Sequence, residues 1–299
     1  MRRRLYALST LVLMGLLALP AFAAGAEEGS NGEEDFDPAL EFELEPYVSI
    51  NLGPLDMSIN KAVLYLIGAS LICIGVGLFT VRKGLNLKPK GGQNVVEMLY
   101  EFSESQIARP TLPERNRTFE RYFPFIATLF LFLLVSNVFS FIPFPVSHET
   151  GVFPFGIPDL GLYAATANIN VTLTLTIMVF LLTHIEGVRA HGGFGYVKTL
   201  VPPAPPAIKP LIFVLELLSQ LLRLVSLSVR LFANLLVGHL LIIVSAGFVL
   251  LLGSFIGVIA IPVGVFFYVF EVLLVAGLQA FIFAMLSGIY IGFAVEAPH

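Results

Sequence analysis

The chain has 299 residues, of which 57% are hydrophobic and only 13% are charged, and its formal net charge is −4. Soluble domains carry about 25% charged residues, so this composition excludes an ordinary soluble domain and predicts several membrane-spanning segments. The single cysteine, Cys73, excludes an internal disulfide.

The N-terminus has the features of an export signal. Three arginines at positions 2–4 precede an apolar run at 5–19, and the small residue Ala23 fits a cleavage site. An uncleaved membrane helix is the alternative, but the run is short and ends at Pro20. We therefore expect residues 1–23 to be a cleavable signal peptide of the bacterial type, because a mitochondrial transit peptide would be amphipathic.

The next segment, residues 24–60, is acidic. Its part from 25 to 46 is dense in Glu and Asp and has only scattered apolar residues, so it cannot bury enough surface to order itself. We interpret residues 24–60 as a mobile exported segment, and residues 61–299 as one membrane domain.

Five apolar runs follow, each long enough to cross a hydrocarbon core of about 30 Å. They are residues 61–81, 123–144, 162–185, 210–245 and 254–293. The fold class predicted is an all-α polytopic membrane protein.

The last two runs are too long for helices that stand upright in a bilayer. We expect them to form an antiparallel hairpin of two long, steeply tilted helices; a surface segment followed by an ordinary span is the alternative. The break between them stays open. Its candidates are Gly247, Gly253, Gly257 and Pro262.

The basic residues predict the orientation. Segment 82–122 holds eight Lys and Arg, and segment 188–209 holds three, whereas 24–60 and 145–161 hold none. By the positive-inside rule the mature N-terminus lies outside and the C-terminus inside. Segment 82–122 also has a helix-period apolar stripe, which predicts an amphipathic helix on the inner membrane surface or, alternatively, one that docks a soluble partner.

Polar residues in the fourth run are the candidates for function. Glu216, Arg223 and Arg230 recur every seven residues and so share one helix face, whereas His239, nine residues after Arg230, points to the opposite side. Ser226 and Asn234 flank Arg230 at four-residue spacing. For Arg223 we favour snorkelling to the interface or pairing with Glu216.

Arg230 is the most informative of these residues, because a charge near the middle of a bilayer costs at least about 2.5–3.5 kcal/mol. A guanidinium cannot lose its proton, but at about 4 Å and an effective dielectric of about 20 it attracts a carboxylate by about 4 kcal/mol. Arg230 is therefore suited to making passing acids release protons without conducting them. A purely structural role is the alternative.

The fifth run adds Glu271 and, eight residues later, Gln279. In an antiparallel hairpin Glu271 reaches the level of His239, which predicts a proton relay; a buried ion pair that only joins two helices is the alternative. Gln279 reaches the level of Arg230.

Further polar residues occur in the second and third runs. They could line an access channel, or the threonines could bond back to their own helix. They are Asn168, Thr172 and Thr176, and Ser136, Asn137 and Ser140. The sequence has no helical zinc motif and predicts no metal site.

The two phrases SVRLFANLLVGH (228–239) and LQAFIFAMLSGIYI (278–291) resemble subunit a of the F-type ATP synthase, and the resemblance extends from about residue 60 to 293. It implies a proton-conducting stator subunit that serves a ring of c subunits through two offset half-channels. Arg230 would separate them, with Asn234 and Gln279 beside it. Glu216 would belong to the inner half-channel.

His239 and Glu271 match the outer half-channel pair of that family, with one departure. The family pattern has the acid seven residues before the glutamine, and here the distance is eight. The resemblance also implies peripheral-stalk b subunits, the remaining ATP synthase subunits and membrane lipid as partners. It implies no nucleic acid, cofactor or catalytic activity in this chain.

The location implied is a bacterial plasma membrane, with a mitochondrial inner membrane as the alternative. Two functions compete with this interpretation. A secondary transporter is disfavoured because no inverted repeat is visible, and a membrane scaffold would use the same buried charges without transport.

Overall fold

A computed structural model describes residues 51–52, 55–56, 58–82, 91–113, 118–142, 163–200, 205–251 and 253–296. The expected signal peptide (1–23) and residues 24–50 of the acidic segment lie outside them. Apart from a small antiparallel hairpin, β1 (Asn51–Leu52) with β2 (Leu55–Asp56), the regular structure described is helical.

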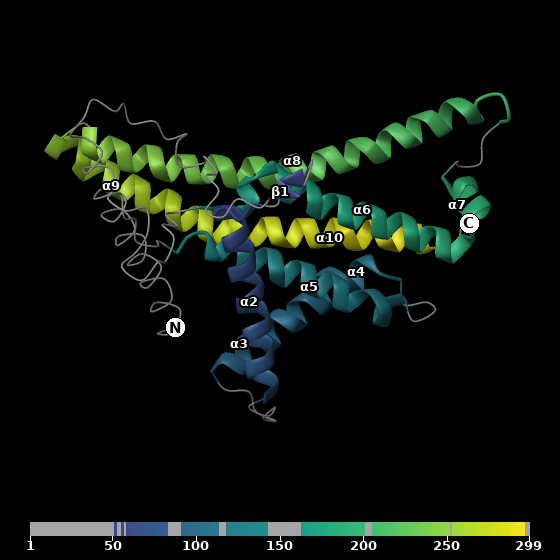
Figure 1. Ribbon diagram of the computed structural model, residues 1–299, viewed down its shortest axis with the longest axis horizontal. Coiled ribbons are helices and arrows are strands. Elements are labelled where there is room, and N and C mark those ends of the chain that lie inside the picture. The colour runs from purple at the N-terminus through teal and green to yellow at the C-terminus, as the bar shows by residue number, and fades with distance from the viewer. Residues whose placement is uncertain are drawn as a thin grey trace. The chain divides into compact units, whose positions relative to one another are not determined.

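Five helical segments of the described chain are long and apolar enough to cross a membrane, which confirms the all-α polytopic fold. The elements that form them are α2 (Lys61–Arg82), α5 (Thr118–Phe139), α6 (Ile169–His191), α8 (Lys209–Leu251), and α9 (Gly253–Phe270) continued by η6 (Glu271–Ala276) and α10 (Gly277–Val295) (Figure 1).

Shorter helices connect the long ones. The expected amphipathic helix is confirmed as α3 (Gly92–Phe102), and its continuation is a π-helix, η3 (Ser103–Ala108), followed by one turn, α4 (Arg109–Thr111). The other short elements are the 3₁₀ turn η5 (Ala165–Ala167) and α7 (Gly193–Thr199).

Helix boundaries differ from those expected in the second and third spans. α5 begins at Thr118 instead of 123, because a helix continues into the polar interface to satisfy its own backbone, whereas hydropathy marks only the apolar part. α6 begins at Ile169 instead of 162, because the chain before it forms η5. α8 ends at Leu251 and α9 begins at Gly253, so Gly253 marks the break and Pro262 lies inside α9.

The chain divides into two compact units. Unit 1 contains the described residues within Met1–Leu71, Val135–Asn168 and Ala233–Leu278. Its core has one cluster of Phe141, Ile242, Tyr268 and Ala276 and another of Ala62, Tyr65, Tyr163 and Ala165. In this unit α8 runs antiparallel to the α9–η6 segment, since His239 lies at Glu271 and Ile242 packs with Tyr268.

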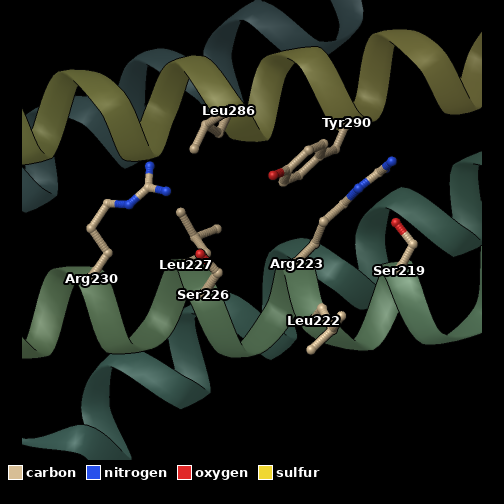
Figure 2. A pocket seen from close by; sticks show the side chains of 8 residues that line it. All are labelled: Ser219, Leu222, Arg223, Ser226, Leu227, Arg230, Leu286 and Tyr290. Atoms are coloured by element: carbon tan, nitrogen blue, oxygen red, sulfur yellow. The ribbon is translucent and has the colours of Figure 1, made fainter.

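Unit 2 contains Ile72–Leu134, Ile169–Phe232 and Gln279–His299. Its α5 and α6 are joined by the buried Glu186, which accepts hydrogen bonds from Tyr122 (2.5 Å) and Arg189 (2.6 Å) and lies 3.3 Å from Arg121. α8 is antiparallel to α10 here as well, because Tyr290 lies at Arg223 and the earlier residue Leu286 lies nearer to the later residue Arg230 (Figure 2).

Candidate functional site

His239 and Glu271 are brought together in unit 1, as expected. Their side chains are 0% and 2% exposed, and His239 Nδ1 lies 3.4 Å from Glu271 Oε1. The same Nδ1 lies 3.1 Å from the carbonyl oxygen of Leu235, and the imidazole packs on the ring of Phe141 with centroids 4.7 Å apart. The ring is therefore fixed on one side by its own helix and on another by the turn that follows α5.

Three polar atoms of this pair have no hydrogen-bond partner among the described residues. They are His239 Nε2 and both carboxyl oxygens of Glu271. Buried polar groups are nearly always hydrogen-bonded, either to protein or to ordered water, and bound water typically bonds to buried polar atoms that the protein leaves without a partner. The pair is thus a buried, ionisable site that can accept further hydrogen bonds.

The Glu271 carboxyl group packs directly against the backbone of α8 at Gly238. A β-carbon built on Gly238 would collide with all three atoms of that carboxyl group. In the sequence Gly238 is one residue of the phrase at 228–239, and nothing there predicts its contact with Glu271. This role cannot be predicted from a glycine next to a histidine, because it depends on where the helix that carries Glu271 packs.

Glu271 begins the π-helix η6, and two polar residues lie at its other end. The Asn137 amide donates to the carbonyl oxygen of Ala276 at 3.2 Å, and Thr166 Oγ1 donates to Asn137 Oδ1 at 2.9 Å. Asn137 was expected as a polar residue of the second span, whereas Thr166 was not singled out. Nearby, the Tyr268 hydroxyl donates to the carbonyl of Phe141 at 2.7 Å.

Arg230 belongs to unit 2 and lies on an exposed face of α8. It shares a cavity of about 240 Å³ with Arg223, and both side chains extend toward α10 (Figure 2). No hydrogen bond or ion pair joins Arg230 to another described residue. The cavity is lined by Ser219, Leu222, Arg223, Ser226, Leu227, Arg230, Leu286 and Tyr290.

Arg223 does not pair with Glu216, contrary to one of the two roles favoured for it. Its guanidinium carbon lies 5.5 Å from the centre of the Tyr290 ring, a cation–π contact. Glu216 instead accepts a hydrogen bond from Gln220 at 2.9 Å. The positive charge of Arg223 therefore interacts with the aromatic ring of Tyr290 within unit 2.

The remaining expected residues are placed as follows. Ser226 lines the cavity beside Arg230, and Asn234 is exposed on α8. Gln279 is only 5% exposed, and no hydrogen bond joins it to Arg230 among the described residues.

The third-span residues are bonded locally. Thr172 and Thr176 donate to carbonyl oxygens of their own helix, at 3.1 Å and 2.8 Å, which matches the alternative stated for them. Asn168 precedes α6 and hydrogen-bonds the hydroxyl of Tyr163. Burial raises the pKa of Tyr163, and this hydrogen bond opposes the rise.

Comparison with known proteins adds independent information. The profile of the family described as ATP synthase A chain matches residues 63–292. The chain is 32% identical to ATP synthase subunit a of Chloroherpeton thalassium over 324 residues, which cover 96% of this chain and 91% of the relative. It is 34% identical to ATP synthase subunit a of Rubrobacter xylanophilus over 256 residues, covering 84% and 89%. It is also 34% identical to ATP synthase subunit a of a Chelativorans species over 270 residues, covering 88% and 99%.

Proposed function

The chain belongs to the ATP synthase A chain family, and from this premise we propose that Arg230 separates two proton half-channels that serve a ring of c subunits. Family membership and its five apolar helices make the chain a multi-pass, proton-translocating subunit of the Fo sector. The half-channels, the ring contact and the residue roles are the proposal.

The outer half-channel uses His239 and Glu271. Both are buried and 3.4 Å apart, and three of their polar atoms lack partners among the described residues. Water can supply those hydrogen bonds and carry a proton to the pair, because an imidazole nitrogen and a carboxylate oxygen can each accept a proton. A proton passed on from this pair neutralises a carboxylate of the ring, which then turns into lipid.

Arg230 acts on the carboxylates that arrive from the other direction. Its guanidinium stays charged, is exposed on α8, and has no ion-pair partner among the described residues. A protonated carboxyl group of the ring that reaches Arg230 can therefore release its proton toward the inside, and the carboxylate that remains takes the place of a partner. This observation, an unpaired arginine on a membrane helix, carries the proposal.

The other residues support these two sites. Asn234 and Gln279 lie beside Arg230 in the proposed pathway, and Glu216 and Ser226 belong to the inner half-channel. Asn168, Thr172 and Thr176 are assigned to the outer access route; a hydroxyl that donates to its own helix can still accept a hydrogen bond from water.

The setting of this subunit is proposed from charge. The eleven Lys and Arg of segments 82–122 and 188–209 favour a cytoplasmic position for these segments and an outside position for the mature N-terminus. A bacterial plasma membrane is proposed from the export signal expected at residues 1–23. The partners are the c-ring, peripheral-stalk b subunits and the rest of the F-type ATP synthase. The energy involved is about 2.3 kcal/mol for each proton that crosses 100 mV.

Arg230→Lys tests the proposal in the assembled complex. A lysine can lose its proton and lacks the planar fork of arginine, so we expect coupled ATP synthesis to be lost while the complex still assembles. The matched control is Arg223→Lys, on the same helix and cavity, which keeps a cation over Tyr290 and retains synthesis. Synthesis retained by Arg230→Lys would refute the proposal, and loss of assembly would favour a scaffold role.

A further inference from the structure

The π-helix η6 keeps Glu271 on the buried side of its helix. Buried positions before and after it recur every three or four residues, but Glu271 and Ala276 are five residues apart. In an α-helix, five residues turn by about 500°, which would place Ala276 about 140° from Glu271. A π-turn takes one more residue than an α-turn, so both residues face the interior of unit 1.

The end of η6 is held by a short polar chain from two other segments. The side chains of Asn137 and Thr166 are fully buried, at 0% exposure each. Thr166 donates to the amide oxygen of Asn137, so the amide nitrogen is directed at the carbonyl of Ala276. The Asn137 amide nitrogen therefore keeps this hydrogen bond only while Ala276 occupies its present position.

The conformation of η6 needs such support. A π-helix is rare and persists as a single turn, because an α-helix offers better hydrogen-bond geometry. If the extra residue moved along the helix, Glu271 would rotate by about 100°. Its carboxyl group would then leave Gly238 and His239.

We propose that Asn137 and Thr166 are positioning residues, which fix the π-helix at Ala276 and thereby hold Glu271 against His239. This inference rests on the proposed function of the pair. Neither positioning residue needs to touch a proton in transit. They act by fixing the rotational position of the helix turn that carries Glu271.

The first test compares isosteric changes in membrane vesicles that contain the assembled complex. Thr166→Val removes the hydroxyl and Thr166→Ser retains it. The control is Thr183→Val, a buried threonine whose hydroxyl donates only to its own helix, at Val179. We expect Thr166→Val to slow ATP-driven proton pumping, by up to roughly a hundredfold if Glu271 moves by about 1 Å, and the other two variants to pump normally. Equal pumping by Thr166→Val and Thr166→Ser would overturn the inference.

The second test separates positioning from channel lining. Deleting Leu274, which is 52% exposed, reduces the spacing of the two buried positions from five residues to four, so the turn becomes α-helical and needs no support. We expect Asn137→Leu to reduce pumping strongly in the full-length chain and much less in the deletion background. An equal reduction in both backgrounds would show that Asn137 acts as a polar channel residue. If the deletion variant does not assemble, the comparison of Thr166→Val with Thr166→Ser tests the inference by itself.

Glu271→Gln, measured alongside, distinguishes failure of this inference from failure of the proposed function. Normal pumping by Glu271→Gln would refute the role of Glu271 itself. Lost pumping in Glu271→Gln, together with normal pumping in Thr166→Val and Asn137→Leu, would refute only the positioning role.

Discussion

Gly238 and the carboxyl group of Glu271 are in direct contact, so that the place of a methyl group on Gly238 is already filled by the carboxyl atoms. This contact is possible because residue 238 has no side chain. It brings the acid of one helix onto the backbone of the other, beside His239.

Gly238→Ala is therefore expected to displace Glu271 and to reduce ATP-driven proton pumping in vesicles. Adding Glu271→Asp, which shortens the acid by one methylene group, should recover part of the rate. The matched control is Gly75→Ala, where a β-carbon meets nothing within 4 Å among the described residues. Unchanged pumping in Gly238→Ala would argue against a fixed Glu271.

Tyr268→Phe is expected to lower stability by removing one buried hydrogen bond. The Tyr268 hydroxyl is the buried donor to the Phe141 carbonyl, and a buried acceptor left unpaired costs about 1–3 kcal/mol. Thermal unfolding of the detergent-solubilised complex measures the effect. Tyr100→Phe, at an exposed position, is the control. Identical unfolding midpoints for the two variants would contradict this role.

Glu186→Ala is expected to destabilise the packing of α5 on α6. The change leaves the Tyr122 hydroxyl without its acceptor, at a cost of about 1–3 kcal/mol, whereas the two arginine partners are mostly exposed and contribute little. Glu104→Ala is the comparison, because its ion pair with Arg109 is more exposed. A larger loss of thermal stability in Glu104→Ala would be evidence against this ranking.

Tyr196 gives a pH-dependent prediction. Burial raises the pKa of its phenol, and the negative charge of Glu216 raises it further. The resulting stabilisation is fully present below the unfolded pKa of about 10 and is lost as pH rises through the higher folded pKa. Glu216→Gln should lower the pKa of Tyr196.

Tyrosinate absorbance measures this titration, because the chain has nine tyrosines and no tryptophan. The contribution of Tyr196 is the tyrosinate absorbance of the unchanged protein minus that of its Tyr196→Phe variant. The same difference is then measured in proteins that also carry Glu216→Gln. A Tyr196 pKa that does not change in Glu216→Gln would exclude the electrostatic contribution.

Much of the fold could be predicted because apolar runs of membrane length are explicit in the sequence. The first span begins at Lys61 as expected, and α8 begins at Lys209, one residue from the expected position. The predicted start of α5 was wrong because the helix continues beyond the apolar run, where its backbone groups still hydrogen-bond to one another. The predicted start of α6 was wrong because the apolar residues before Ile169 form η5 instead.

The pairing of His239 with Glu271 could be predicted from antiparallel packing, but the geometry that allows it could not. The eight residues from Glu271 to Gln279 were interpreted as regular α-helix, and η6 interrupts that helix. Nothing in the sequence Glu271–Ala276 marks a π-turn. Its supports, Asn137 and Thr166, are more than a hundred residues away along the chain.

The π-turn also affects how related chains should be aligned. A length change in a membrane helix normally rotates every later side chain, but here one surplus residue is absorbed within six. A chain whose acid lies seven instead of eight residues before the glutamine can therefore keep its helix faces with a regular α-turn at this point. Its alignment gap belongs between Glu271 and Ala276, and not in a connecting loop.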